Sequence, residues 1–174
     1  PSSLGYNYRQ SRDVGWAGKF PVFRAASPED LLEALKGFVR EPSAQQVVAW
    51  ENSIPSLQQQ VGTVLDSEAQ AKEFSALLEY LMPMEARRSD AIFLLNDRVL
   101  VLEYKGYPRL DWADIDQARH YLSSLKNFHR DCHNRKVDAV LVLMGGKMAM
   151  LDHSGVHVCG PSARPVPAGR RRVP

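Results

Sequence analysis

The chain has 174 residues, a length that suits one ordinary domain and is short for two. Hydrophobic residues make up 44% and charged residues 24%, and 22 Lys and Arg against 20 Asp and Glu leave a net charge of +2. A uniformly basic surface is therefore excluded, so any nucleic-acid binding must come from local patches. No apolar run approaches the roughly 20 residues that cross a bilayer, so no membrane partner is expected.

The compartment is predicted from two further features. The first residues lack the basic-then-apolar order of a signal peptide. Cys132 and Cys159 are too few for a disulfide scaffold. We therefore expect a cytoplasmic protein.

The N-terminal part is expected to contain an arm and two helices. Residues 1–26 mix aromatic and basic side chains with glycines, which favours an irregular arm laid on the core; stacking of the aromatics on nucleotides is the alternative. Ser27 can cap a helix that ends before Pro42. Ser43 can cap a longer helix, which Pro55 is expected to kink or restart.

The pattern then changes to short apolar runs that are typical of strands. Four strands are predicted at 77–82, 90–95, 98–105 and 137–144, with a hairpin turn at Asn96-Asp97 and short β-like pieces at 148–151 and 156–158. Asp111 caps a predicted third helix between the last two of these four strands. The order α-α-β-β-β-α-β predicts one α/β domain over residues 27–160 with a mixed sheet flanked by helices, followed by a Pro/Arg-rich tail or linker at 161–174.

Charged residues occur where two of these strands leave the apolar pattern. Side chains alternate along a strand, so Glu103 and Lys105 share one face with Val99 and Val101, and Tyr104 points the other way. Pairing across the predicted turn can bring Asp90 alongside Glu103, because each lies six to seven positions from the turn. Charged residues at the end of a buried strand form either a functional site or a salt bridge at the strand end.

The chemistry of these residue types suits metal-assisted phosphodiester hydrolysis. Two neighbouring carboxylates repel each other without a cation, and their oxygens suit Mg²⁺ or Mn²⁺. A lysine beside them can hold and deprotonate an attacking water or stabilise the developing charge. Gln117 and Tyr121, one helical turn apart, flank the apolar face of the next helix and could contact that lysine or a phosphate; an ordinary half-buried pair is the alternative.

This pattern resembles the PD-(D/E)xK nuclease superfamily, whose core has the α-β-β-β-α-β order of a restriction-endonuclease-like fold. Gln117-x-x-x-Tyr121 is similar to the Q-x-x-x-Y element of its RecB-like branch. The closest likeness is to the nuclease-like domain at the N-terminus of Schlafen-group-3-like DNA/RNA helicases. It runs from about residue 15 to about residue 144 and rests on the motifs Gly15-Trp16, Trp50-x-x-Ser53, Glu79-Tyr80-x-x-Pro83, Arg88-x-Asp90 and Glu103-x-Lys105.

The resemblance implies a role for each matching residue. Asp90 and Glu103 would bind Mg²⁺ or Mn²⁺, with Glu79 as a third carboxylate or a supporting group and the Tyr104 carbonyl as a further ligand. Lys105 would activate water. The chain departs from the family where Ser89 replaces the usual proline before Asp90, and the sequence given contains no G-x-x-x-x-G-K-[ST] motif of a helicase.

Other candidate residues carry weaker patterns. His129, Cys132, His133, His153, His157 and Cys159 lack the paired C-x-x-C spacing of a structural zinc site, so scattered histidines and partly buried cysteines are favoured. Arg87 and Arg88, just before Asp90, could position a nucleic-acid backbone or pair with Glu85. The run Arg170-Arg171-Arg172 could contact phosphate or be a solvated terminus.

The sequence therefore predicts a cytoplasmic, Mg²⁺-dependent deoxyribonuclease in which Gln117 and Tyr121 brace lysine and phosphate. Its partners would be DNA and a helicase or ATPase domain in cis or in trans. The alternative is a nuclease-fold module without activity that binds nucleic acid or a helicase partner. A third possibility is a structural domain in which Glu103 and Lys105 form an ion pair.

Overall fold

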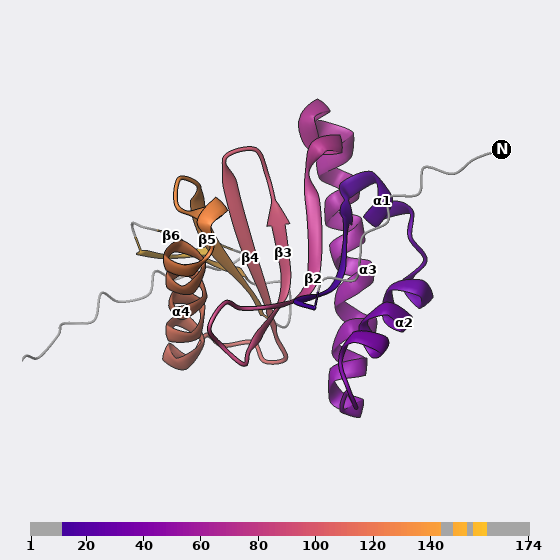
Figure 1. Ribbon diagram of the computed structural model, residues 1–174, viewed down its shortest axis with the longest axis horizontal. Helices are drawn as coiled ribbons and strands as arrows, with labels where there is room; N and C mark the ends of the chain where they lie inside the picture. Colours follow the sequence, from indigo (N-terminus) through magenta and orange to yellow (C-terminus); the bar gives the residue numbers. More distant parts are fainter. Residues whose placement is uncertain (1–11, 144–147, 153–154, 160–174) are drawn as a thin grey trace, which may run out of the picture.

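The computed structural model describes residues 12–143, 148–152 and 155–159 and has one seven-stranded sheet between two layers of helices (Figure 1). Helices α1, α2 and α3 lie on one face of the sheet, and α4 lies on the other. The elements in chain order are β1 (Val14–Lys19), α1 (Phe20–Ala25), α2 (Pro28–Phe38), α3 (Ala44–Ser67), β2 (Ser75–Leu81), β3 (Arg88–Leu94), β4 (Arg98–Lys105), α4 (Trp112–Phe128), β5 (Lys136–Leu143), β6 (Met148–Asp152) and β7 (Gly155–Cys159), with short 3-10 turns at Ala69–Glu73 and Arg130–Cys132.

The strands follow one another across the sheet in sequence order, from β1 to β7. Among the strands that the structure describes, β4 and β5 run parallel and are joined by α4, and the other neighbouring strands are antiparallel. This parallel pair needs a crossover, which α4 provides. The predicted α/β class with a mixed sheet is confirmed.

The helix ends lie where the capping residues predict them. The Ser27 and Ser43 hydroxyls each accept a hydrogen bond from the backbone three residues on, at 3.1 Å, and Asp111 forms a capping box with Asp114. Helix α3 continues through Pro55 without restarting. The prediction of an irregular arm is wrong for the part of residues 1–26 that the structure describes. Residues 14–19 form edge strand β1, and residues 20–25 form α1, which buries Phe20 and Phe23.

Alternation along the strands divides the core into two layers. Ala91, Phe93 and Leu102 pack toward α1–α3, whereas Ile92, Val99 and Val101 pack toward α4. Both strands of the predicted hairpin are buried on both faces, so their apolar runs are nearly continuous. No helix in the described part of the chain is long and apolar enough to cross a membrane. The tail at 161–174 lies outside the described residues.

Strand β2 breaks its alternation at Glu79, which has a left-handed backbone with φ 52°. Leu78 and the Glu79 side chain consequently both lie on the α3 face, while Leu77 and Tyr80 pack toward α4. The neighbouring edge strand carries Gly15 at this point, where a Cβ atom would come within 3.2 Å of Glu79 Cβ and 2.7 Å of Leu35 Cδ2. Glycine at position 15 therefore makes room for the turned glutamate.

We predict that Gly15→Ala lowers the free energy of unfolding by about 1–3 kcal/mol, because the added methyl group overpacks this contact. Gly37→Ala is the matched control, since Gly37 lies in α2 with no atom within 4 Å of the added Cβ. The control should raise stability by about 0.5–1 kcal/mol through helix propensity. Urea unfolding measures both, and equal midpoints for Gly15→Ala and the parent would contradict the close packing.

Candidate active site

Two carboxylates lie at the point where β3 and β4 stop pairing. The regular ladder between these strands ends at Ala91 and Leu102. Beyond it, Asp90 Oδ2 accepts a hydrogen bond from the Tyr104 amide at 2.7 Å, and Glu103 Oε1 accepts one from the Asp90 amide at 3.3 Å. Side-chain oxygens thus take the place of backbone carbonyls, and the predicted meeting of Asp90 with Glu103 is confirmed.

Lys105 lies on the same face as Glu103, toward α4, as alternation predicts. Its ammonium group contacts Gln117 Oε1 at 2.9 Å, Asp114 Oδ1 at 3.2 Å and Glu103 Oε2 at 3.8 Å. The Lys105 side chain is 11% exposed and that of Glu103 is 6% exposed. The charged end of β4 is therefore buried beneath α4 and is accompanied by more than one acidic partner.

Gln117 and Tyr121 form one chain of hydrogen bonds with this lysine. The Gln117 amide donates to the Tyr121 hydroxyl at 2.7 Å, while its carbonyl accepts from Lys105. The Tyr121 hydroxyl in turn donates to the Arg88 carbonyl at 3.2 Å, at the start of β3. The predicted pair on α4 therefore touches both the lysine and the strand that carries Asp90.

Asp114 also belongs to this cluster, and it is not among the site residues predicted from the sequence. It is 5% exposed and accepts hydrogen bonds from the Tyr107 hydroxyl and from the Asp111 amide, besides contacting Lys105. The sequence held a signal for it, because Asp114 occupies the third position after the cap Asp111 and lies one turn before Gln117. A capping acid on the face of Gln117 points toward the same lysine.

Glu79 lies on the other side of Asp90, with both of its oxygens occupied. The Trp50 indole donates to Oε1 at 2.7 Å, and Arg88 Nε donates to Oε2 at 2.8 Å. A cavity of about 90 Å³ between α3 and the sheet is lined by Trp50, Ser53, Glu79, Asp90 and Tyr104 among others. Each of the five motifs quoted from the sequence thus contributes a residue to the surroundings of Glu79 and Asp90, and Gly15 does so by lying against Glu79.

The surroundings of Asp90 and Glu103 disfavour the ionised form of both carboxyl groups, so both pKa values are raised. Burial raises the pKa of Glu103, and the nearby Asp90 raises it further. Burial also raises the pKa of Asp90, although the hydrogen bond from the Tyr104 amide opposes this. For Asp114, burial alone would raise the pKa, but hydrogen bonds from Tyr107 and Lys105 contribute to lowering it. A proton or another cation is therefore favoured between Asp90 and Glu103.

The donor set suits a hard divalent cation held by two side chains. Asp90 Oδ1 accepts no hydrogen bond from the described residues, and Glu103 Oε2 has only the distant Lys105. The Tyr104 amide points into the gap between β3 and β4, where the ladder has ended. Because the amide and the carbonyl of one strand residue face the same neighbouring strand, we expect the Tyr104 carbonyl to face this gap too. Within the described ranges, no three His, Cys, Asp or Glu side chains are grouped to hold a metal, and the oxygens of Glu79 are already engaged.

The remaining candidates are dispersed. Arg88 is tied to Glu79, whereas Arg87 is exposed and forms no ion pair with a described residue. His129, Cys132, His133 and His157 form no metal-binding group in the part of the chain that the structure describes, and His153 lies outside it. The run at 170–172 also lies outside the described residues.

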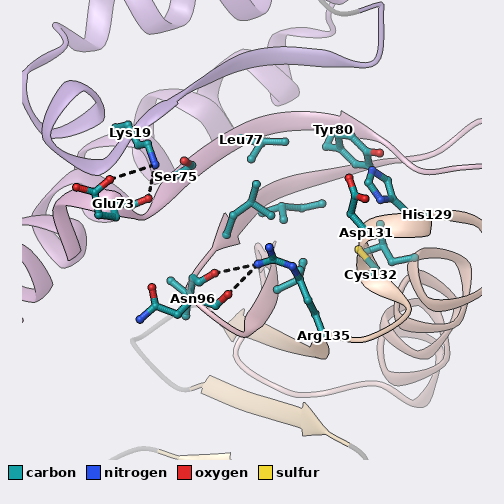
Figure 2. Close-up of a pocket in the computed structure, with 15 residues that line it drawn as sticks. Lys19, Glu73, Ser75, Leu77, Tyr80, Asn96, His129, Asp131, Cys132 and Arg135 are labelled. Carbon is teal, nitrogen blue, oxygen red and sulfur yellow. Dashed lines mark hydrogen bonds and ion pairs between the residues drawn. The ribbon is translucent and has the colours of Figure 1, made fainter. Parts of the chain in front are cut away.

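A separate cavity of about 400 Å³ lies toward the opposite ends of the same strands (Figure 2). Lys19 and Glu73 pair at one end, and Tyr80, His129, Asp131 and Cys132 gather at the other. Arg135 donates to the backbone carbonyls of Leu95 and Asn96 beside it. Among the described residues that line it, His129 Nδ1 is buried without a hydrogen-bond partner, and the lining contains neither Asp90, Glu103 nor Lys105.

No protein-family model matches the chain, and searches of curated proteins and of solved structures find no match either.

We predict that the free energy of unfolding falls as pH rises from about 5 to 8 in metal-free buffer. A carboxyl whose pKa is raised in the folded state binds more protons there than in the unfolded chain, and burial and Asp90 raise the pKa of Glu103 from 4.5 to about 9. Its contribution to the free energy of unfolding is therefore fully present below pH 4.5 and is lost progressively as the pH rises toward about 9. Glu103→Gln removes the titrating group and should flatten this slope.

Urea unfolding at pH 5, 6.5 and 8 measures the effect, with exposed Asp97→Asn as the matched control. The control should keep the slope of the parent. An equally steep slope in Glu103→Gln would show that this carboxyl does not carry the dependence.

Proposed function

We propose that this protein is a divalent-metal-dependent nuclease of the PD-(D/E)xK type, with a restriction-endonuclease-like core, that hydrolyses phosphodiester bonds in DNA. The proposal rests on one observation above all. Asp90 and Glu103 meet where β3 and β4 separate, and Lys105 lies on the same face, 3.8 Å from Glu103. The convergence of Gly15, Trp50 and Arg88 around Glu79, which lines a cavity together with Asp90, supports it too, since those residues belong to the resembling motifs.

The balance of charge supports binding of a divalent cation. Asp90, Glu103 and Asp114 contribute three negative charges when ionised and Lys105 one positive charge, which leaves −2; Glu79 and Arg88 cancel each other. A divalent ion at Asp90, Glu103 and the Tyr104 carbonyl would neutralise this charge in a buried place, where uncompensated charge is costly. Bound there, Mg²⁺ or Mn²⁺ would supply Lewis-acid stabilisation of the phosphate oxygens.

The chain's own residues would carry the other parts of the reaction. Lys105 orients or deprotonates the attacking water and stabilises charge that develops on the phosphate. Gln117 and Tyr121 hold the ammonium group at its place, and Arg87, exposed near the start of β3, positions the nucleic-acid backbone. Arg88 holds Glu79 in place through an ion pair at 2.8 Å. The Arg88 side chain is 32% exposed, so it could also contact a phosphate.

We expect calorimetry to detect Mn²⁺ binding to the parent protein and to lose it in Asp90→Asn, because this change removes a charged ligand oxygen. The exposed Asp97→Asn serves as the matched control and should bind as the parent does. Absence of Mn²⁺ binding in the parent at millimolar concentration would favour the alternative, a module that binds nucleic acid or a helicase partner without cutting.

We expect the parent to cleave plasmid and oligonucleotide DNA only when Mg²⁺ or Mn²⁺ is present, and Lys105→Ala to cleave roughly 10²–10⁴-fold more slowly. Lys105→Met, which keeps the apolar stem, separates loss of the ammonium group from loss of packing. The exposed Lys36→Ala is the control and should cleave like the parent. Unchanged cleavage by folded Lys105→Ala would remove the lysine from the mechanism.

A further inference from the structure

Asp114 has contacts that neither metal binding nor helix capping accounts for in full. Its Oδ2 accepts from the Asp111 amide at 3.2 Å, which completes the cap of α4. Its Oδ1 faces in another direction, toward the Lys105 ammonium at 3.2 Å and the Tyr107 hydroxyl. A capping acid needs only the first contact, so the second set points to a further role.

The Lys105 ammonium is held from two sides by α4. Gln117 Oε1 accepts from it at 2.9 Å, and Asp114 Oδ1 lies at 3.2 Å, whereas Glu103 Oε2 is farther away at 3.8 Å. A lysine stem has four rotatable bonds, so a single acceptor would leave the ammonium group free to turn about that contact. Two acceptors one turn apart on a capped helix define its position.

Tyr107 connects this arrangement to the surface. It lies two residues after Lys105 in the loop between β4 and α4, and it is 40% exposed. Its hydroxyl donates to Asp114, so the exposed loop is joined to the buried ammonium through one carboxylate. Movement of residues 106–111 would therefore change the environment of Lys105.

We propose that Asp114 is a positioning residue for Lys105, and that Tyr107 couples the exposed loop 106–111 to the lysine through Asp114. The inference rests on the proposed function for its catalytic meaning, but the positioning itself is a property of the folded protein. Contact of a substrate with this loop would thus regulate how the ammonium group is presented. Asp114 acts through Lys105 and does not itself need to touch substrate or metal.

The direct test is ¹⁵N NMR of lysine ammonium groups in the metal-free protein at fixed pH and temperature. Hydrogen-bonded buried ammonium groups exchange slowly with water and give visible signals, so the Lys105 signal is assigned as the one missing from Lys105→Met. We expect faster exchange in Asp114→Asn, loss of the signal in Asp114→Ala and an intermediate rate in Tyr107→Phe. The exposed Asp116→Asn on the same helix is the control and should keep the parent's rate.

Cleavage kinetics supply a second readout that a purely structural role would not move. We expect Asp114→Asn, assayed below its melting temperature, to lower kcat roughly 10-fold to 100-fold with KM for DNA unchanged, since misplacement of a reacting group acts on the chemical step. Parent-like exchange of the Lys105 ammonium in folded Asp114→Asn overturns the proposal, and so does a change in KM alone.

The two proposals fail separately. If the parent cuts no DNA but Asp114→Asn accelerates ammonium exchange, the nuclease proposal falls and the positioning role stands. If the parent cuts DNA and Asp114→Asn behaves like Asp116→Asn in both measurements, the nuclease proposal stands and the positioning role falls.

Discussion

Between β3 and β4, two side-chain carboxylates accept the hydrogen bonds that backbone carbonyls would accept in a regular ladder, and this replacement determines the geometry of the whole site. A strand amide left without a partner in the interior is costly, so the Tyr104 amide must find an acceptor where the ladder ends. Asp90 provides one, and Glu103 does the same for the Asp90 amide. Because each carboxylate satisfies the backbone of the opposite strand, the separation of the strands and the meeting of the acids are one feature.

The surrounding elements hold this gap open from both faces. On one face α4 supplies Gln117, Tyr121 and Asp114 to Lys105, and the Tyr121 hydroxyl also reaches the Arg88 carbonyl at the start of β3. On the other face α3 supplies the Trp50 indole to Glu79, whose left-handed backbone is accommodated by Gly15. Backbone strain of this kind persists only where the neighbouring structure determines it, and here Trp50 of α3, Gly15 of β1 and Arg88 of β3 all contact Glu79 or adjoin it.

The sequence predicted those features that depend on local periodicity and spacing. Alternation placed Glu103 and Lys105 on one face, the length of the hairpin placed Asp90 beside Glu103, and helical spacing placed Gln117 over Tyr121. The helices capped by Ser27, Ser43 and Asp111 begin as predicted. These relations hold within one element or one hairpin, where geometry follows directly from residue number.

The features that the sequence did not predict depend on contacts between distant segments. The glycines around residue 15 predict an irregular segment, yet pairing with β2 makes this segment a strand. Glycine is needed at position 15 because a Cβ atom there would approach Glu79 too closely. Glu79, which has the left-handed φ, is hydrogen-bonded by Trp50 and Arg88, which lie 29 residues before it and 9 residues after it. No local pattern carries that information, because the tertiary contact overrides the preference of the strand.

The same oxygens that close the backbone also determine how the site responds to solution conditions. A proton on Glu103 or a divalent cation between the two acids would relieve the same repulsion, so the two compete for one place. Lys105 cannot relieve it alone, because its ammonium lies closer to Gln117 and Asp114 than to Glu103. Under the proposed function, an external cation would neutralise the acids between the strands, while the lysine would stay beside them at the distance that Gln117 and Asp114 set.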